Sequence, residues 1–317
     1  MELRTGENDS GRRLDRVLRK ALRNHPLPLI YRLLRQGLIL VDGKPARAED
    51  RISAGVLISI PSLKDIINSP DPPMHHAPGA VDILWQGHGL IAVNKPAGLA
   101  THGPESLDTM VNSYLAGRLP TSLSFRPGPL HRLDKPSSGI VVFSASIEGA
   151  RNFSSLLRER NVRKTYLALV EGKLEKEEIW QDELTRDKNK KKTFIREKPD
   201  SSVSKSAGSC AKTALTRVTP LAVNSDYSLI KATISTGRTH QIRAQASAHG
   251  HPLAEDYKYG GKPLELGAHH SGKKSCAGFF LHAWKLELER ILIQAPIPPA
   301  FTEVITQLFG NNIITDN

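Results

Sequence analysis

Several features that define large classes of protein are missing from this sequence. Among 317 residues, only Cys210 and Cys276 are cysteines, too few for a disulfide framework or a cysteine zinc site, and this usage suits a reducing compartment. No stretch reaches the roughly 18 to 20 uncharged apolar residues of a membrane-spanning helix. The N-terminus, MELRTGENDS, lacks the apolar core of a signal peptide. We therefore expect a cytoplasmic protein.

Metal-binding patterns and repeats are absent as well. His75 with His76, and His269 with His270, are adjacent pairs that lack cysteine or carboxylate partners at zinc-site spacing. We interpret them as surface histidines and expect neither a metal nor a cofactor. Because no internal repeat or heptad seam indicates obligate assembly, we expect a monomer.

The chain is rich in positive charge. It holds 44 lysine and arginine residues against 32 aspartate and glutamate residues, which gives a net charge of +12. Positive charge without an export signal favours a polyanionic partner, most often nucleic acid. The hydrophobic fraction of 39% is enough for an ordinary core, so a chain disordered throughout is excluded.

A proline-rich segment divides the chain. Residues 62–78, SLKDIINSPDPPMHHAP, contain four prolines and no apolar periodicity. We predict a small domain at residues 1–62, a linker at 63–78, a large domain at 79–309 and a tail at 310–317. Only the large domain is long enough to hold a sizeable active site.

The small domain should contain two helices and a hairpin. Five apolar residues recur at three- and four-residue steps and predict one face of the first helix. They are Leu14, Val17, Leu18, Ala21 and Leu22. A second helix should run from about Leu29 to about Gly37, Asp42 and Gly43 favour a tight hairpin turn, and residues 56–60 indicate a further strand.

The small domain carries about half of the net charge. Residues 1–47 contain eleven basic residues against five acidic ones, and Arg16, Arg32 and Arg35 are available on the outer faces of the two helices. This charge is either a solvated basic face or a binding surface.

The large domain alternates short β-rich runs with fewer helical ones. The runs lie at residues 90–93, 139–143, 166–170, 229–234 and 279–288, and one helix is predicted at residues 147–160. This pattern predicts a mixed α+β fold with mainly antiparallel strands. Residues 186–212, rich in lysine and serine, are interpreted as a mobile basic loop.

Asp134 is the leading candidate for chemistry. It lies in the segment His131-Arg132-Leu133-Asp134-Lys135, before an apolar strand, among positive charges that favour an ionised carboxylate. It is either a nucleophile or base, or a turn carboxylate that caps backbone amides. A second segment, GRTHQIR, places Arg243 where a buried ion pair with Asp134 would satisfy both charges.

Two further residues permit more than one interpretation. Tyr166 lies between a basic stretch and an apolar run, so its ring either stacks on a nucleobase or belongs to the core. Lys95, in the turn Asn94-Lys95-Pro96 after an apolar strand, either meets a phosphate or is a surface lysine.

Taken in order, these segments resemble the RluA family of pseudouridine synthases. The resemblance rests on HRLD at residues 131–134, KTY at 164–166, GRTHQIR at 237–243, NKPAG at 94–98 and LHA at 281–283. The small domain resembles the S-four RNA-binding module, and the segments LIYRLLRQGLILVDGK and AEDYKYG look most like the RluC branch, which modifies large-subunit rRNA. Two departures are Glu255, where many relatives have glycine, and the long segment at 186–212.

The resemblance implies a pseudouridine synthase fold and a cofactor-free, base-flipping reaction. Asp134 would attack the ribose or remove a ribose proton, Arg243 would hold that carboxylate, and Tyr166 would stack on the uracil. Arg132 would fill the space of the extruded base, and Ile242 would form an apolar wall. The other residues implied in substrate or RNA binding are His131, Lys95, Arg16, Arg32 and Arg35.

The implied partner is RNA, with 23S rRNA or the pre-large ribosomal subunit favoured over transfer RNA. Two other functions compete with this interpretation. One is a non-catalytic RNA-binding or ribosome-assembly protein, in which the pair between Asp134 and Arg243 is a structural salt bridge. The other is a hydrolase of glycosyl bonds, for which a pair of carboxylates would be expected.

Overall fold

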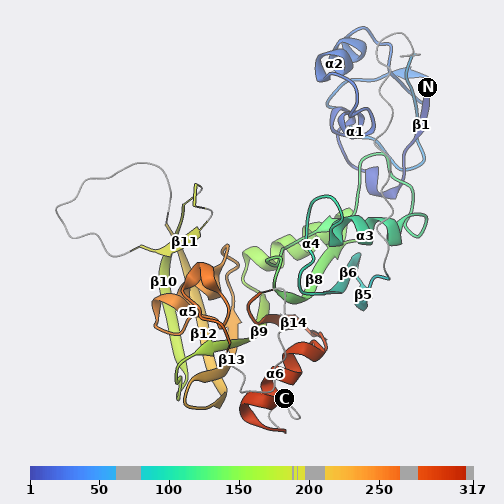
Figure 1. The fold of residues 1–317 in the computed structure, drawn as a ribbon. Coiled ribbons are helices and arrows are strands. Elements are labelled where there is room, and N and C mark those ends of the chain that lie inside the picture. The colour runs from blue at the N-terminus through green and yellow to red at the C-terminus, as the bar shows by residue number, and fades with distance from the viewer. Residues whose placement is uncertain (62–79, 188, 191, 197–210, 265–277, 312–317) are drawn as a thin grey trace, which may run out of the picture.

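The computed structural model describes residues 1–61, 80–187, 189–190, 192–196, 211–264 and 278–311 (Figure 1). The linker predicted at 63–78, the two histidine pairs and both cysteines lie outside the described residues, as does the predicted tail beyond residue 311.

The N-terminal unit is a four-stranded sheet with two helices. Its elements are β1 (Glu2–Arg4), the 3-10 helix η1 (Glu7–Asp9), α1 (Leu14–Ala21), α2 (Leu27–Arg35), β2 (Leu40–Val41), β3 (Lys44–Pro45) and β4 (Leu57–Ser59), with the strand order β1-β4-β2-β3. Leu14, Val17 and Leu18 are fully buried, which confirms the predicted face of α1. Asp42 and Gly43 join β2 to β3 with positive φ angles of 46° and 77°, as a tight hairpin turn requires.

The large unit is built on one extended sheet. Its elements are β5 (Ile83–Gly87), β6 (Leu90–Lys95), α3 (Leu107–Leu115), β7 (Gly128–Pro129), β8 (Ser138–Ser144), α4 (Ile147–Arg158), β9 (Val162–Glu171), β10 (Glu178–Asp187), β11 (Lys192–Ile195), β12 (Lys212–Val223), β13 (Tyr227–Ile234), α5 (Gln241–Ala248), the 3-10 helix η2 (Tyr257–Tyr259), β14 (Leu281–Leu288), β15 (Ile291–Gln294) and α6 (Pro299–Phe309).

The strand order of this sheet is β11-β10-β12-β13-β9-β14-β8-β6-β5, with β15 on β14 and β7 on β8. All of these pairings among the described strands are antiparallel except β14 with β8, so the fold class predicted from sequence is confirmed. At the parallel pair, Gly139 has a φ of +105° and packs directly on the backbone of Ala283, where a Cβ atom would collide. Glycine is therefore required just after the HRLD turn.

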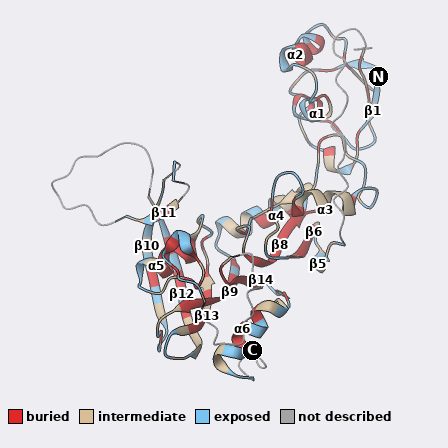
Figure 2. Cartoon of the chain, in the orientation of Figure 1, coloured by how far each residue is buried: buried red, intermediate tan, exposed pale blue. Residues whose placement is uncertain are grey.

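The core follows the central strands (Figure 2). Every residue of β8 is buried, as are eight of the ten residues of β9, and these strands lie side by side with β14, whose first four residues are buried too. A strand buried on both faces reads as a continuous apolar run rather than an alternating one, which is why β8 and β9 were predictable.

The structure contradicts one sequence interpretation in part. The segment 186–212 was expected to be a mobile loop, and residues 188, 191 and 197–210 of it lie outside the described residues. Its described part is largely strand: Asp187 ends β10, Lys192–Ile195 form β11, and Lys212 begins β12. β11 pairs with β10, and Thr193 is buried. A polar composition does not predict such a hairpin, because its strands form through pairing and packing.

The two units contact each other through Asp9. Its buried carboxylate accepts hydrogen bonds from the Ser122 hydroxyl (2.8 Å) and from the backbone N–H groups of Leu123 (2.9 Å) and Ser124 (3.0 Å). Arg12 donates to the Ser124 hydroxyl at 2.7 Å. The N-terminal unit is thus attached to the loop that follows α3.

Candidate active site

A cavity of about 590 Å³ opens where the loop before β8 meets the junction between β13 and α5. Its lining comes from four parts of the chain: residues 130–134 and 137, residues from 157 to 166, residues 234–243, and Leu281. Strands β9 and β13 are neighbours in the sheet, so segments about 70 residues apart in sequence line the same cavity.

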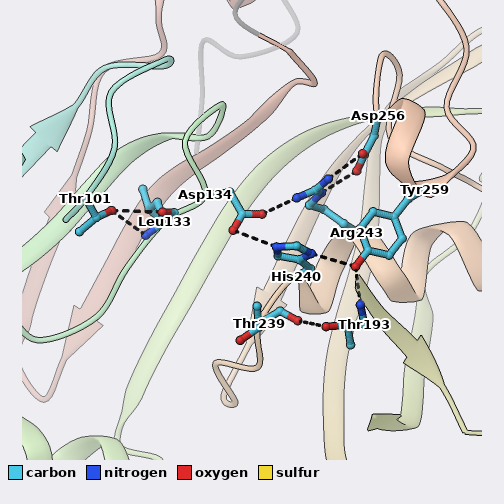
Figure 3. A network of polar contacts seen from close by, with 9 residues as sticks. All are labelled: Thr101, Leu133, Asp134, Thr193, Thr239, His240, Arg243, Asp256 and Tyr259. Carbon is cyan, nitrogen blue, oxygen red and sulfur yellow. Dashed lines mark hydrogen bonds and ion pairs between the residues drawn. The ribbon is translucent and has the colours of Figure 1, made fainter. Parts of the chain in front are cut away.

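The centre of the site is an arginine held by two carboxylates (Figure 3). Arg243 donates from Nη1 to Oδ2 of Asp134 at 2.7 Å, and from Nε and Nη2 to the two oxygens of Asp256 at 2.6 and 2.7 Å. Arg243 is 6% exposed and Asp256 1% exposed, whereas the Asp134 side chain is 20% exposed to the cavity. Burial opposes the charge on Arg243, but the bonds to both carboxylates raise its pKa and keep it cationic.

A histidine and a tyrosine approach the other side of Asp134. His240 Nε2 lies 3.7 Å from Asp134 Oδ1, and His240 Nδ1 lies 2.9 Å from the Tyr259 hydroxyl. That hydroxyl also accepts the backbone N–H of Thr193 at 2.9 Å, so the tyrosine connects His240 to β11. Burial lowers the pKa of His240. The backbone of His240 has a φ of +53°, an unusual conformation that often marks functional sites.

Thr101 and Lys95 hold the loop that carries Asp134. The Thr101 hydroxyl donates to the carbonyl of Leu133 (3.1 Å) and accepts the Leu133 N–H (3.3 Å), as Figure 3 shows. Lys95 donates from Nζ to the carbonyls of Pro96 (2.9 Å), Leu99 (2.7 Å) and Lys135 (3.2 Å). The side chain of Lys95 is fully buried, so the interpretation as a phosphate contact is wrong: its ammonium ties two loops together.

His131 is also a structural group. Its Nε2 accepts the backbone N–H of Val142 at 3.1 Å, and its ring stacks on Phe153 with centroids 6.1 Å apart. Burial, with a smaller contribution from the charge of Lys164, lowers the pKa of His131 to about 3. A neutral ring with Nε2 in use offers no cation to RNA, but His131 lines the cavity, and its role in binding stays a prediction.

The remaining predicted residues fall into two groups. Tyr166 and Ile242 are buried at the cavity wall, and Arg132 is exposed at its edge. Burial, then the charge of Asp134, raises the pKa of Tyr166 above its usual value of 10, so its hydroxyl is protonated. Arg16 on α1 and the pair Arg32 and Arg35 on α2 are exposed on the N-terminal unit and do not line the cavity.

Sequence reasoning missed four residues of this site: Lys164, His240, Asp256 and Tyr259. Asp256 and Tyr259 lie in the AEDYKYG stretch, which was noted only as a point of resemblance. Glu255, next to Asp256, has a φ of +66°, a conformation that glycine adopts without cost. No described group of three or more side chains has the arrangement of a metal site.

Comparison with solved structures defines the class of the large unit. The human proteins described as RNA pseudouridylate synthase domain containing 4 and 1 match with TM-scores of 0.56 and 0.54, at 23% and 21% identity. The matches cover 72% and 76% of this chain and 92% and 93% of theirs. The large unit therefore has the pseudouridylate synthase fold.

Sequence comparison gives the family. The RNA pseudouridylate synthase model matches residues 89–248 and the S4 domain model matches residues 12–58. A ribosomal large subunit pseudouridine synthase C of Haemophilus influenzae is 30% identical, over 90% of this chain and 86% of that protein. The corresponding synthase C of Vibrio cholerae is 28% identical, with 95% of both chains covered, and a synthase D of Neisseria meningitidis is 30% identical over 91% of this chain and 76% of its own length.

The chain belongs to the RNA pseudouridylate synthase family and carries an S4 domain at residues 12–58. It is an enzyme that isomerises uridine in RNA to pseudouridine, as the motifs predicted. Nothing in these likenesses favours a glycosyl hydrolase or a non-catalytic RNA-binding protein.

Proposed function

We propose that the enzyme converts specific uridines of 23S rRNA, using Asp134 as the catalytic carboxylate. The target rests on the relatives named as large-subunit synthases, which align with nearly the whole chain. The carboxylate rests on one observation: Asp134 is the acidic group that lines the cavity, and its Oδ2 is held by Arg243 at 2.7 Å.

The reaction breaks the bond between the ribose and the uracil nitrogen, turns the base and rejoins it through carbon five. One carboxylate oxygen of Asp134 is bound by Arg243, and the side chain lines the cavity, where the other oxygen would attack the ribose or accept a ribose proton. Arg243 aligns the carboxylate through a charge-assisted hydrogen bond.

Tyr166 and Ile242 suit the base rather than the sugar. Both are buried side chains at the cavity wall, where an aromatic face and an aliphatic surface can hold a detached uracil. Arg132 is exposed beside Asp134 in sequence and lines the same cavity, as expected for a side chain that fills the space of an extruded base. Arg16, Arg32 and Arg35 of the S4 domain would contact RNA phosphates.

The decisive experiment replaces Asp134 by asparagine, which keeps size and polarity but removes the charge. Asp134→Asn should bind RNA as the wild type does and give no detectable pseudouridine. Release of tritium from RNA labelled at carbon five of uracil measures turnover, and filter binding measures affinity. Substantial residual turnover would remove Asp134 from the catalytic role.

The target is tested in cells that lack the gene. Carbodiimide mapping of total RNA should show pseudouridines that disappear from 23S rRNA, whereas sites lost from transfer RNA would overturn the proposed target. A cytoplasmic, monomeric enzyme is expected, and sedimentation of the purified chain tests the monomer. Among the described residues, no helix is long and apolar enough to cross a bilayer.

A further inference from the structure

Lys164 is a buried cation without a partner. It lies on β9 with 9% of its surface exposed, and it lines the cavity that contains Asp134. No hydrogen bond or ion pair is formed by its ammonium group with any described residue. Burial lowers its pKa to about 8, so most of the population still carries the charge at neutral pH. An unpaired buried charge is costly, and such groups concentrate where a ligand supplies the missing partner.

Lys95 is a second buried lysine of this unit, and it differs from Lys164 in its hydrogen bonds. It too is buried with a pKa lowered to about 8, but its ammonium donates to three backbone carbonyls. Those bonds compensate for the loss of water. Lys164 makes no such bonds with the described residues, and it lies at the wall of an open cavity.

The surroundings of Lys164 suit an anion. Gly237 leaves space beside the ammonium: a Cβ atom at this position would lie 3.3 Å from Lys164 Nζ. Arg158 and Arg160, both exposed, line the same cavity and add positive charge. Burial, with a smaller contribution from the charge of Lys164, lowers the pKa of the His131 ring, so this ring adds no competing charge.

The spacing along β9 suits one nucleotide. Alternate residues of a strand point to the same face, so Lys164 and Tyr166 are roughly 6.6 Å apart along the strand and both reach the cavity. This separation is comparable with the distance from a nucleobase to its own phosphate. A base stacked on Tyr166 would therefore place a backbone phosphate near Lys164.

We propose that Lys164 binds a phosphate of the RNA strand, next to the uridine whose base Tyr166 receives. The inference rests on the proposed use of this cavity for the target uridine, and it adds a contact between β9 and the RNA backbone. Asp134 is not the partner of Lys164, because that carboxylate is bound by Arg243. A phosphate is the anion that RNA brings into the cavity in every substrate.

The test compares Lys164→Met with Lys173→Met, which removes an exposed lysine beyond the end of β9. Affinity for a single-stranded oligouridylate is measured at several salt concentrations. Lys164→Met should weaken binding about tenfold, and the slope of log affinity against log salt should fall by about 0.7, the loss of one phosphate contact. Lys173→Met should leave both quantities unchanged, and Lys164→Arg should retain the slope.

Stability separates binding from a structural role. Because Lys164 has no partner in the folded chain, methionine should leave the melting temperature equal or higher. A lower melting temperature with an unchanged salt slope would assign Lys164 to the fold, and an unchanged slope with a lower turnover number would assign it to the uracil; either result overturns the proposal. Both measurements are independent of which RNA is modified and of the Asp134→Asn result.

Discussion

Arg243 organises the site at the scale of single residues. Its guanidinium engages Asp134 with one nitrogen and Asp256 with two, and a planar fork that is bound on both sides cannot rotate away. Asp256 thereby orients the arginine that orients Asp134. The pair of Asp134 and Arg243 was predictable because two buried opposite charges need each other. Asp256 was not, because nothing in its local sequence distinguishes it from a surface carboxylate.

His240 provides the residue-scale prediction. Asparagine at this position tolerates the positive φ of 53° and keeps a polar group near the Tyr259 hydroxyl, but its shorter side chain does not reach the position of Nε2, which lies 3.7 Å from Asp134 Oδ1. His240→Asn should therefore lower kcat roughly tenfold, because it removes a polar group that lies 3.7 Å from the Asp134 carboxylate, and leave RNA affinity unchanged.

A matched control for His240 is His249→Asn. His249 is also paired with a carboxylate, Asp182 at 3.1 Å, but it does not line the cavity. This variant should retain the wild-type kcat. Equal activities of the two variants would show that His240 does not act on Asp134.

At the scale of elements, the site depends on loops, and different strands hold these loops in place. β11 reaches the site because Thr193 donates its N–H to Tyr259 and its hydroxyl to the carbonyl of Thr239 (2.9 Å), in the loop that leads to His240. The lysine-rich sequence around β11 indicated only charge. Both bonds depend on the register in which β11 pairs with β10, and a polar composition does not predict that register.

His131 makes the loop before β8 sensitive to acid. Its pKa is about 3 in the folded chain against an ordinary value of 6.5, so between these pH values the unfolded chain binds a proton and the folded chain does not. The contribution is fully present above pH 6.5 and is lost as the pH falls from there toward 3. The free energy of unfolding should decline in this window by up to about 1.4 kcal/mol per pH unit for this one group.

The variant His131→Gln tests this dependence. Glutamine can accept the Val142 N–H without titrating, so urea unfolding at pH 7, 6 and 5 should show a shallower decline than the wild type. His102→Gln, at an exposed histidine, should keep the wild-type decline. A slope that is the same in all three proteins contradicts a neutral His131.

At the scale of the whole molecule, polar contacts attach the N-terminal unit to the catalytic unit. Asp9 accepts from Ser122, Leu123 and Ser124, and Asn8 accepts the N–H of Ile147 at 3.0 Å. A fixed attachment holds the basic helices at a constant position relative to the cavity, which raises their effective concentration near bound RNA.

Loss of this attachment should weaken RNA binding without affecting the chemistry. Asp9→Ala removes the carboxylate that receives these donors, so affinity for rRNA should fall by roughly threefold to tenfold, while kcat at saturating RNA stays unchanged. Asp50→Ala removes an exposed carboxylate that bonds only within the S4 domain, to the N–H of Arg47, and should have no effect. Filter binding and tritium release measure the two quantities, and an unchanged affinity of Asp9→Ala would argue against a fixed attachment.

The sequence by itself determined the reaction class, the α+β fold, the helices and hairpin of the S4 domain, the buried central strands, and the pair of Asp134 and Arg243. These follow from local patterns: apolar periodicity, turn residues, ordered motifs and the need of buried charges for partners. Only the tertiary structure decided which cations are available to RNA. Lys95 and Lys164 both follow apolar or basic stretches in sequence, yet one is satisfied by three carbonyls and the other by none. Whether a charge is compensated depends on atoms from distant parts of the chain, so no local pattern reports it.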